Sequence, residues 1–199
     1  ETGYIQRKLV KAMEDIRIAS DLTVRNSIGS IIQPAYGYDG MDAQWVENQP
    51  FDVHSLPMQD FERKYRFGHQ ADDGDPSTEA ARREYADLLQ RRTTLQEQQI
   101  IPAKGVVPNS NTTPLPLNVQ RTLEHASHHQ TEHQSDLTPA SVVGRVDSLM
   151  RQFRSASALH ARAFNSDVQF LFETQVRAVL CCRNVIDRFR LTGDTLDGV

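Results

Sequence analysis

The strongest constraint on the fold is the spacing of apolar side chains between residues 168 and 189. Eight of them, together with one glutamine, fall near a single face of a helix with 3.6 residues per turn. A long apolar face has to be buried against other elements, so we expect this helix to organise the core. The face consists of Val168, Leu171, Phe172, Gln175, Val176, Val179, Cys182, Ile186 and Phe189.

Four arginines lie on or just beyond the same predicted helix. A basic patch would need them on one side, but Arg177, Arg183, Arg188 and Arg190 are dispersed around the helix axis. This distribution favours solvation and local ion pairing over a binding patch.

The middle of the chain is predicted to hold two helices separated by a loop. A short helix is predicted over residues 58 to 67, and the polar, acidic residues 68 to 76 are typical of a mobile loop. Asp75 and Pro76 provide an N-cap and a first-turn proline for a helix running to about Gln98. Its apolar positions are sparse, so we expect a surface helix with one thin buried edge. These positions are Ala81, Tyr85, Leu88, Leu89 and Leu95.

A proline-rich stretch divides that helix from the next ones. Residues 99 to 117 contain four prolines, which exclude a helix and a central strand, so 99 to 116 are expected to form a linker or exposed excursion. A helix should follow from Leu117 to about His128. Thr138 and Pro139 predict another helix start. Its apolar residues are Val142, Val143, Val146, Leu149, Met150 and Phe153.

The first residues predict an amphipathic helix with two separate stripes. Tyr4, Arg7, Lys8 and Lys11 follow the i, i+3, i+4, i+7 pattern of one stripe. The other stripe lies roughly 120° away and suits a protein core. It consists of Ile5, Leu9, Ala12 and Ile16. Geometry alone does not establish nucleic-acid contact, because basic residues on such a helix usually form a solvated face.

A small antiparallel hairpin is expected after this helix. Residues 23 to 26 and 30 to 33 flank a turn in which Gly29 can take the left-handed conformation that a bulged hairpin needs. An irregular segment follows, and Trp45, Val46, Phe51 and Val53 are expected to pin it to a core. The alternative is that Trp45 is exposed and binds a partner.

Composition limits the function classes. A net charge of −4 and a pI near 6.0 do not fit a free-standing nucleic-acid binder, so any such contact must be local. The only two cysteines are adjacent, which makes a mutual disulfide strained and indicates a reducing compartment. A length of 199 residues predicts one domain or two small ones. Because the sequence has no apolar run long enough to span a bilayer, we expect a soluble, intracellular protein.

Two clusters of potential ligands are candidate metal sites. Asp72, Asp73 and Asp75 are dense, but they lie in the predicted loop where Asp75 already serves as a cap. His125, His129 and His133 are spaced by four and could share a helical face able to bind zinc, together with the neighbouring His128. Neither cysteine ligands nor a buried second shell of carboxylates lies nearby in the sequence. We therefore interpret these histidines as a hydrated helix end rather than a zinc site. Neither a phosphate-binding glycine loop nor a nucleophile elbow occurs.

Several motifs in the chain resemble the largest subunit of multisubunit RNA polymerases, most closely that of eukaryotic RNA polymerase II. The opening residues resemble its bridge helix, and the others follow in family order. The matching segments are 1 to 11 (ETGYIQRKLVK), 23 to 27 (TVRNS), 36 to 43 (YGYDGMDA), 61 to 66 (FERKYR), 114 to 121 (PLPLNVQR) and 171 to 191. The resemblance fades between residues 68 and 113.

The resemblance implies a fragment of a larger subunit, predominantly α-helical within the α+β class. Residues 1 to 38 would be the C-terminal half of the bridge helix and a hairpin, 39 to 191 a foot-like helical domain, and 192 to 199 the start of a return segment. In the family, the bridge helix lies against the template strand. Carried over, Thr2, Tyr4, Arg7, Lys8 and Lys11 would contact nucleic acid.

The resemblance also implies the chemistry and the partners. The parent enzyme is a DNA-directed RNA polymerase whose Mg²⁺ would be held by residues outside this chain, so the fragment alone should be inactive. Its implied partners are the other polymerase subunits, the DNA template and, at the foot, transcription and capping factors. No membrane is implied, and the expected location is the nucleus, or the cytoplasm for a viral enzyme. The alternative is a non-catalytic interaction module or helical scaffold.

Overall fold

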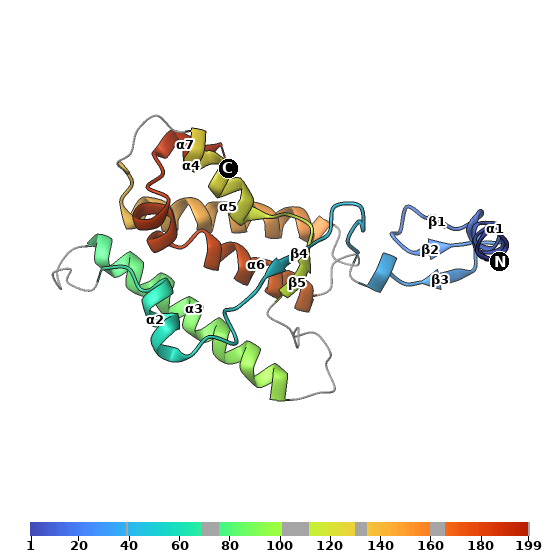
Figure 1. Ribbon diagram of the computed structural model, residues 1–199, viewed down its shortest axis with the longest axis horizontal. Coiled ribbons are helices and arrows are strands. Elements are labelled where there is room, and N and C mark those ends of the chain that lie inside the picture. Colours follow the sequence, from blue (N-terminus) through green and yellow to red (C-terminus); the bar gives the residue numbers. More distant parts are fainter. Residues whose placement is uncertain (39, 69–75, 101–111, 130–134, 160–165, 199) are drawn as a thin grey trace.

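The computed structural model describes residues 1–38, 40–68, 76–100, 112–129, 135–159 and 166–198. It is predominantly helical with small antiparallel sheets, which confirms the expected α+β class. An arm formed by the first helix and a three-stranded sheet extends away from a helical body (Figure 1). The arm contains α1 (Thr2–Met13), β1 (Arg17–Ile18), β2 (Val24–Arg25), β3 (Ile31–Gln33) and the short helix η1 (Tyr36–Tyr38).

The helical body contains the remaining elements. They are a two-stranded ribbon, six helices and one π-helical segment, η2. Their bounds are β4 (Glu47–Pro50), α2 (Met58–Tyr65), α3 (Pro76–Ile100), β5 (Thr112–Leu115), α4 (Val119–His129), α5 (Pro139–Leu159), α6 (Ser166–Val179), η2 (Arg183–Arg188) and α7 (Gly193–Asp197). The predicted starts at Pro76 and Pro139 and the predicted helices near residues 58 and 119 are confirmed.

The arm confirms the predicted hairpin and adds a strand. β2 and β3 pair antiparallel with a bulge between Val24 and Arg25, and Gly29 in their connection has φ = 86°. β1 pairs with the other edge of β2, with Arg17 opposite Arg25. Sequence reasoning missed β1 because two residues are too few to show an alternating pattern.

Helix α6 organises the core, as predicted, by packing on both of its sides. One cluster joins it to α4, α5 and η2, and the other joins it to α2, α3 and the segment after β4. Fully buried members of the two clusters include Leu123, Val142, Val185 and Leu191 in the first, and Phe51, Phe61, Leu88 and Leu95 in the second.

The predicted uninterrupted helix to residue 189 is wrong, because α6 ends at Val179. Side chains replace the missing helical hydrogen bonds there. The carboxylate of Glu84 on α3 accepts the Cys182 N–H at 3.0 Å and 3.3 Å. The Asn184 amide donates to the carbonyls of Ala178 and Val179 at 3.2 Å and 3.1 Å. The chain then continues as η2.

The buried edge of α3 is wider than predicted. Besides its leucines, it buries the charged side chains of Glu84, Arg91 and Arg92. Arg91 lies within 2.9 Å of Asp87 and 3.6 Å of Glu173, while Arg92 donates to the Leu56 carbonyl at 2.6 Å. In a sequence, charged residues predict a solvent-exposed helix face. Here each buried charged side chain of α3 has a partner that compensates for its burial.

Part of the proline-rich stretch is a strand rather than a linker. β5 pairs antiparallel with β4, and its Thr113 and Leu115 are buried. Pro114 is tolerated because both strands of a two-stranded ribbon are edges. Gln49 of β4 is also buried and donates to the carbonyls of Leu115 and Leu117 at 3.1 Å and 2.9 Å.

The irregular segment before the body is only partly pinned as predicted. Phe51 and Val53 are buried, but Trp45 is 64% exposed, so its predicted packing is wrong. Leu149 of α5 is exposed as well.

Across the described ranges, no helix combines the length and apolar character that crossing a lipid bilayer requires.

Candidate nucleic-acid interface

Helix α1 presents the predicted basic stripe to solvent. Every residue of α1 is exposed, and Tyr4 is 69% exposed. Tyr4, Arg7, Lys8 and Lys11 line one shallow hollow of 360 Å³ together with Ala12. The structure therefore brings these four side chains together, as their i, i+3, i+4, i+7 spacing predicts.

The charges of this stripe are partly uncompensated. Lys11 pairs with Glu14 at 2.8 Å, an exposed contact worth at most about 1 kcal/mol. Arg7 and Lys8 have no ion pair within the part of the chain that the structure describes. Two cationic side chains are thus open to an anionic ligand.

Thr2 lies at the first turn of α1, one end of the stripe. Nothing lies within 4 Å of the position that a Cβ would take on the neighbouring Gly3, so a ligand can approach the backbone there. From Thr2 to Lys11 the helix rises about 14 Å, which is roughly the length of four nucleotides along one strand. The predicted site residues therefore form a strip that a short stretch of nucleic acid could follow.

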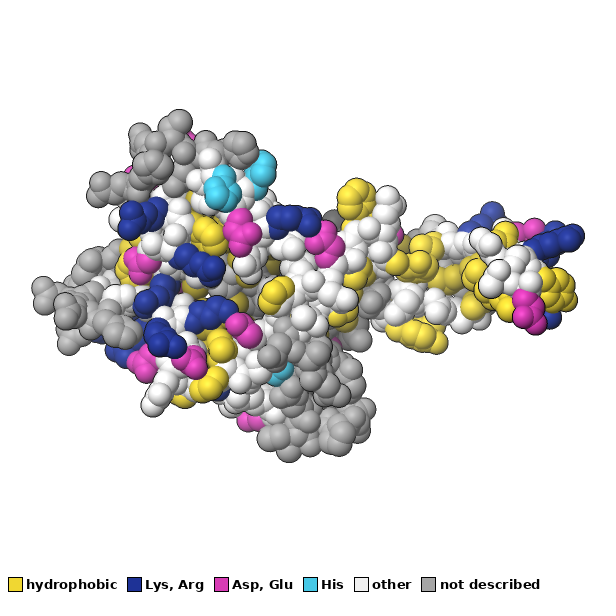
Figure 2. All heavy atoms as spheres, viewed as in Figure 1, with side chains coloured by type: hydrophobic (Ala, Val, Ile, Leu, Met, Phe, Trp, Pro, Cys, Tyr) yellow, Lys and Arg dark blue, Asp and Glu magenta, His cyan; other side chains and the backbone are white. Residues whose placement is uncertain are grey.

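The apolar stripe of α1 is not buried against the core of this chain. Ile5 and Leu9 are 55% and 54% exposed. Twelve of the fifteen large apolar side chains that are exposed among the described residues lie in residues 1–45, and Figure 2 shows hydrophobic side chains along the arm. Among the described residues, no element buries Ile5 or Leu9, so the apolar stripe is an exposed hydrophobic face.

Short polar contacts hold the turns of the arm. The Asp15 carboxylate accepts the Ser27 hydroxyl and N–H at 2.8 Å and 3.3 Å, and these bonds lower its pKa. Hydrogen bonds from Thr23 and then the Arg25 guanidinium lower the pKa of Asp21 to about 2. These contacts fix the connection from α1 to the sheet without burying it.

The two metal candidates are not tested. Asp72, Asp73, Asp75 and His133 lie outside the described residues, and so does the side chain of His129. His125 and His128 are exposed on α4. Within the described ranges, no three histidines, cysteines or carboxylates lie close enough to hold a metal ion.

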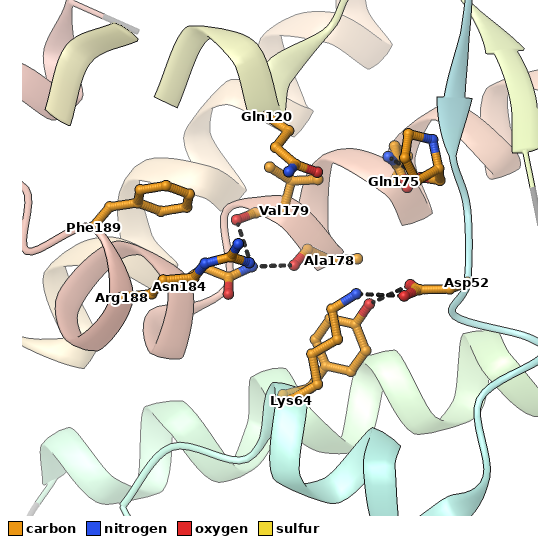
Figure 3. Close-up of a pocket in the computed structure, with 11 residues that line it drawn as sticks. Asp52, Lys64, Gln120, Gln175, Ala178, Val179, Asn184, Arg188 and Phe189 are labelled. Carbon is orange, nitrogen blue, oxygen red and sulfur yellow. Dashed lines mark hydrogen bonds and ion pairs between the residues drawn. The ribbon is translucent and has the colours of Figure 1, made fainter. Parts of the chain in front are cut away.

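A small polar hollow lies in the helical body where α2, α4, α6 and η2 meet (Figure 3). Its volume is 40 Å³, and most of its polar groups bond to one another. Lys64 pairs with Asp52 at 2.5 Å, and the Tyr65 hydroxyl donates to the same carboxylate at 3.1 Å. Burial, followed by the Asp52 charge, raises the pKa of Tyr65. This arrangement joins the elements and offers no free acid or base.

A larger hollow of 570 Å³ lies between α4, α5, α6 and α7 and is mainly apolar. Its charged lining residues, Arg145 and Asp197, pair with each other at 2.5 Å. It therefore lacks the unpaired titratable groups that general acid–base catalysis needs.

Residues 41–199 match the family model described as RNA polymerase Rpb1, domain 6. The match covers about four fifths of the chain and all elements of the helical body. It begins after α1, so the basic stripe lies outside the matched residues.

Proposed function

Because the chain belongs to the RNA polymerase Rpb1 domain 6 family, it is part of the largest subunit of a DNA-directed RNA polymerase, and we propose that α1 positions the template strand. The parent enzyme is a nucleotidyltransferase, and its partners include DNA and the other polymerase subunits. The role of α1 within that enzyme is the new element of the proposal.

One observation carries this role: Arg7 and Lys8 are exposed and without an ion pair in the described residues, beside an exposed Tyr4. Cations hold phosphates without reading sequence, and an aromatic ring stacks on any base. A polymerase needs contacts of this kind because every template sequence passes through it. The resemblance of residues 1 to 11 to the bridge helix supports the same role.

The apolar stripe gives α1 a second side. Ile5 and Leu9 would pack on protein elsewhere in the polymerase, while the basic stripe contacts nucleic acid. A helix held along one side and contacted by the strand on the other can bend between its anchored ends. Gly3 eases such bending during translocation, because glycine is the most flexible helical residue.

Nucleotide addition requires divalent cations that neutralise charge on the transferring phosphoryl group. We assign this chemistry to Mg²⁺ held by carboxylates elsewhere in the subunit. The residues of this chain then orient the strand, and the chain alone is inactive.

For the helical body, residues 39 to 191, we propose a foot-like docking role for transcription and capping factors. The small polar hollow and the 570 Å³ apolar hollow described above lack unpaired catalytic groups, which favours binding over chemistry. Residues 192 to 199 would begin the return to the cleft. The motifs favour the RNA polymerase II type of subunit, and hence a nuclear location.

Transcript elongation by the intact polymerase tests the role of α1. Changing both Tyr4 and Arg7 to Ala should slow elongation about tenfold, because a stacking contact and a phosphate contact are lost. Arg17→Ala is the matched control, since Arg17 is an exposed arginine of β1 outside the stripe. Unchanged elongation in the double variant, or an equal loss in the control, would contradict the proposal.

A further inference from the structure

Basic side chains gather on one face of the helical body although the chain as a whole is acidic. Figure 2 shows Lys and Arg side chains grouped over α2 and η2. Arg183 donates to the Arg66 carbonyl at 2.7 Å, and Lys64 and Arg188 line the same hollow (Figure 3). Cations more than a hundred positions apart in sequence thus form one surface, which we call the basic face. It comprises Arg63 and Lys64 of α2, Arg66 directly after α2, and Arg183 and Arg188 of η2.

The two arginines of η2 carry the surplus charge of this face. The other three cations, Arg63, Lys64 and Arg66, each have a carboxylate partner, namely Asp60, Asp52 and Glu62. Arg183 and Arg188 have no ion pair within the described ranges of the chain. The basic face therefore presents two guanidinium groups whose charge nothing described in the chain neutralises.

Both guanidinium groups are partly held in place. That of Arg188 lies 5.2 Å from the centre of the Phe189 ring. Arg183 uses one nitrogen for the Arg66 carbonyl and keeps its other N–H groups available. A guanidinium fork matches the two oxygens of a carboxylate, and a pre-positioned side chain loses less entropy on binding.

We infer that the basic face binds an acidic segment of a partner protein, whose carboxylates pair with Arg183 and Arg188. This inference rests on the docking role proposed for the helical body and names the surface and the partner's chemistry. A partner with spaced carboxylates could engage the two arginines without pairing with the cations that Asp52, Asp60 and Glu62 already neutralise.

A nucleic-acid strand fits this face less well. Asp52, Asp60 and Glu62 are interleaved with the cations and would repel a continuous row of phosphates. The face also lacks a stacking platform, because Phe189 is half-buried and lies against Arg188. The exposed Tyr and Trp side chains of the described residues, Tyr4, Tyr36, Tyr38 and Trp45, are all in or next to the arm.

Binding of a fluorescein-labelled ten-residue glutamate peptide to the 199-residue chain, followed by fluorescence anisotropy, tests this inference. Arg188→Gln should weaken binding about tenfold, because a charge-assisted contact is lost, and adding Arg183→Gln should weaken it further. Among the described residues the Arg188 side chain donates no hydrogen bond, so the single variant should keep the wild-type melting temperature. Binding should also weaken as KCl is raised.

A matched control separates the basic face from other cations. Arg151 is an exposed arginine of α5 without an ion pair in the described residues. Changing it to Gln should leave peptide binding unchanged. Equal weakening in a control, or unchanged binding by the Arg188 variant, would overturn the inference. Tighter binding of a single-stranded RNA decamer that is lost with Arg188→Gln would assign the face to nucleic acid instead. None of these outcomes bears on the elongation test of α1.

Discussion

The buried carboxyl of Glu84 should make the stability of this chain depend on pH near neutrality. Its side chain is 9% exposed and its oxygens accept the Cys182 N–H where α6 ends. Burial raises the pKa of Glu84 to about 7, although the Cys182 hydrogen bond and the Arg177 charge act in the opposite direction. The group therefore remains largely protonated in the folded chain at pH values where it ionises in the unfolded chain.

The size of the effect follows from this difference in pKa. A change from 4.5 to about 7 corresponds to about 3 kcal/mol at ~1.36 kcal/mol per pH unit. Between these values the folded chain binds more protons than the unfolded chain, so the free energy of unfolding falls as pH rises. The contribution of Glu84 is fully present below pH 4.5 and is lost by about pH 7.

Glu84→Gln isolates this contribution. The amide keeps an oxygen that can accept the Cys182 N–H but cannot ionise. The stability of the variant relative to wild type should therefore increase by about 3 kcal/mol between pH 4.5 and pH 8. Urea unfolding followed by circular dichroism at pH 4.5, 6 and 8 measures this difference, and any constant cost of the amide cancels.

A control on the same helix distinguishes burial from a general charge effect. Glu79 pairs with Arg83 at 3.1 Å with both side chains largely exposed. Glu79→Gln should change the free energy of unfolding by less than about 1 kcal/mol at every pH. A flat difference between wild type and the Glu84 variant from pH 4.5 to pH 8 would refute the reasoning.

Two further predictions concern the packing around α3 and α6. Leu88→Ala should lower the free energy of unfolding by about 3 kcal/mol, because Leu88 is fully buried. The control Leu149→Ala, at a position that is 46% exposed, should cost under about 1 kcal/mol. Similar losses in the two variants would contradict the assignment of Leu88 to the buried cluster. Glu173→Gln should cost about 2 kcal/mol in the same assay, since it removes the counter-charge of the half-exposed Arg154 and leaves the buried Arg91 with Asp87 alone. A neutral effect would show that the three side chains do not form a buried network.

The parts of the fold that could be predicted from sequence are those fixed by neighbouring residues. Pro76 and Pro139 begin helices because a first-turn proline needs no hydrogen-bond donor, and both starts are where the sequence places them. Gly29 has the positive φ expected in its hairpin. The basic stripe of α1 is likewise a local property, since its members lie within two turns of one helix.

The parts that were missed depend on distant contacts. The end of α6 is set by Glu84, which lies 98 positions away in sequence, so no local signal marks it. β5 forms because β4 is available to pair with it. The basic face is not predicted by the spacing of the η2 arginines, because three of its five cations come from a distant part of the sequence; Arg66 and Arg183 are 117 positions apart. The spacing of residues in the sequence predicts one helix or strand at a time, whereas these features depend on contacts between two elements.

The central claim is that one side of α1 contacts the template strand and the other contacts protein. A photo-crosslinking amino acid placed at Tyr4 or at Ile5 in an intact, transcribing polymerase tests both sides at once. We expect the Tyr4 position to crosslink to template DNA and the Ile5 position to crosslink to polymerase protein. Crosslinking of Tyr4 to protein alone, or of both positions to DNA equally, would contradict the account.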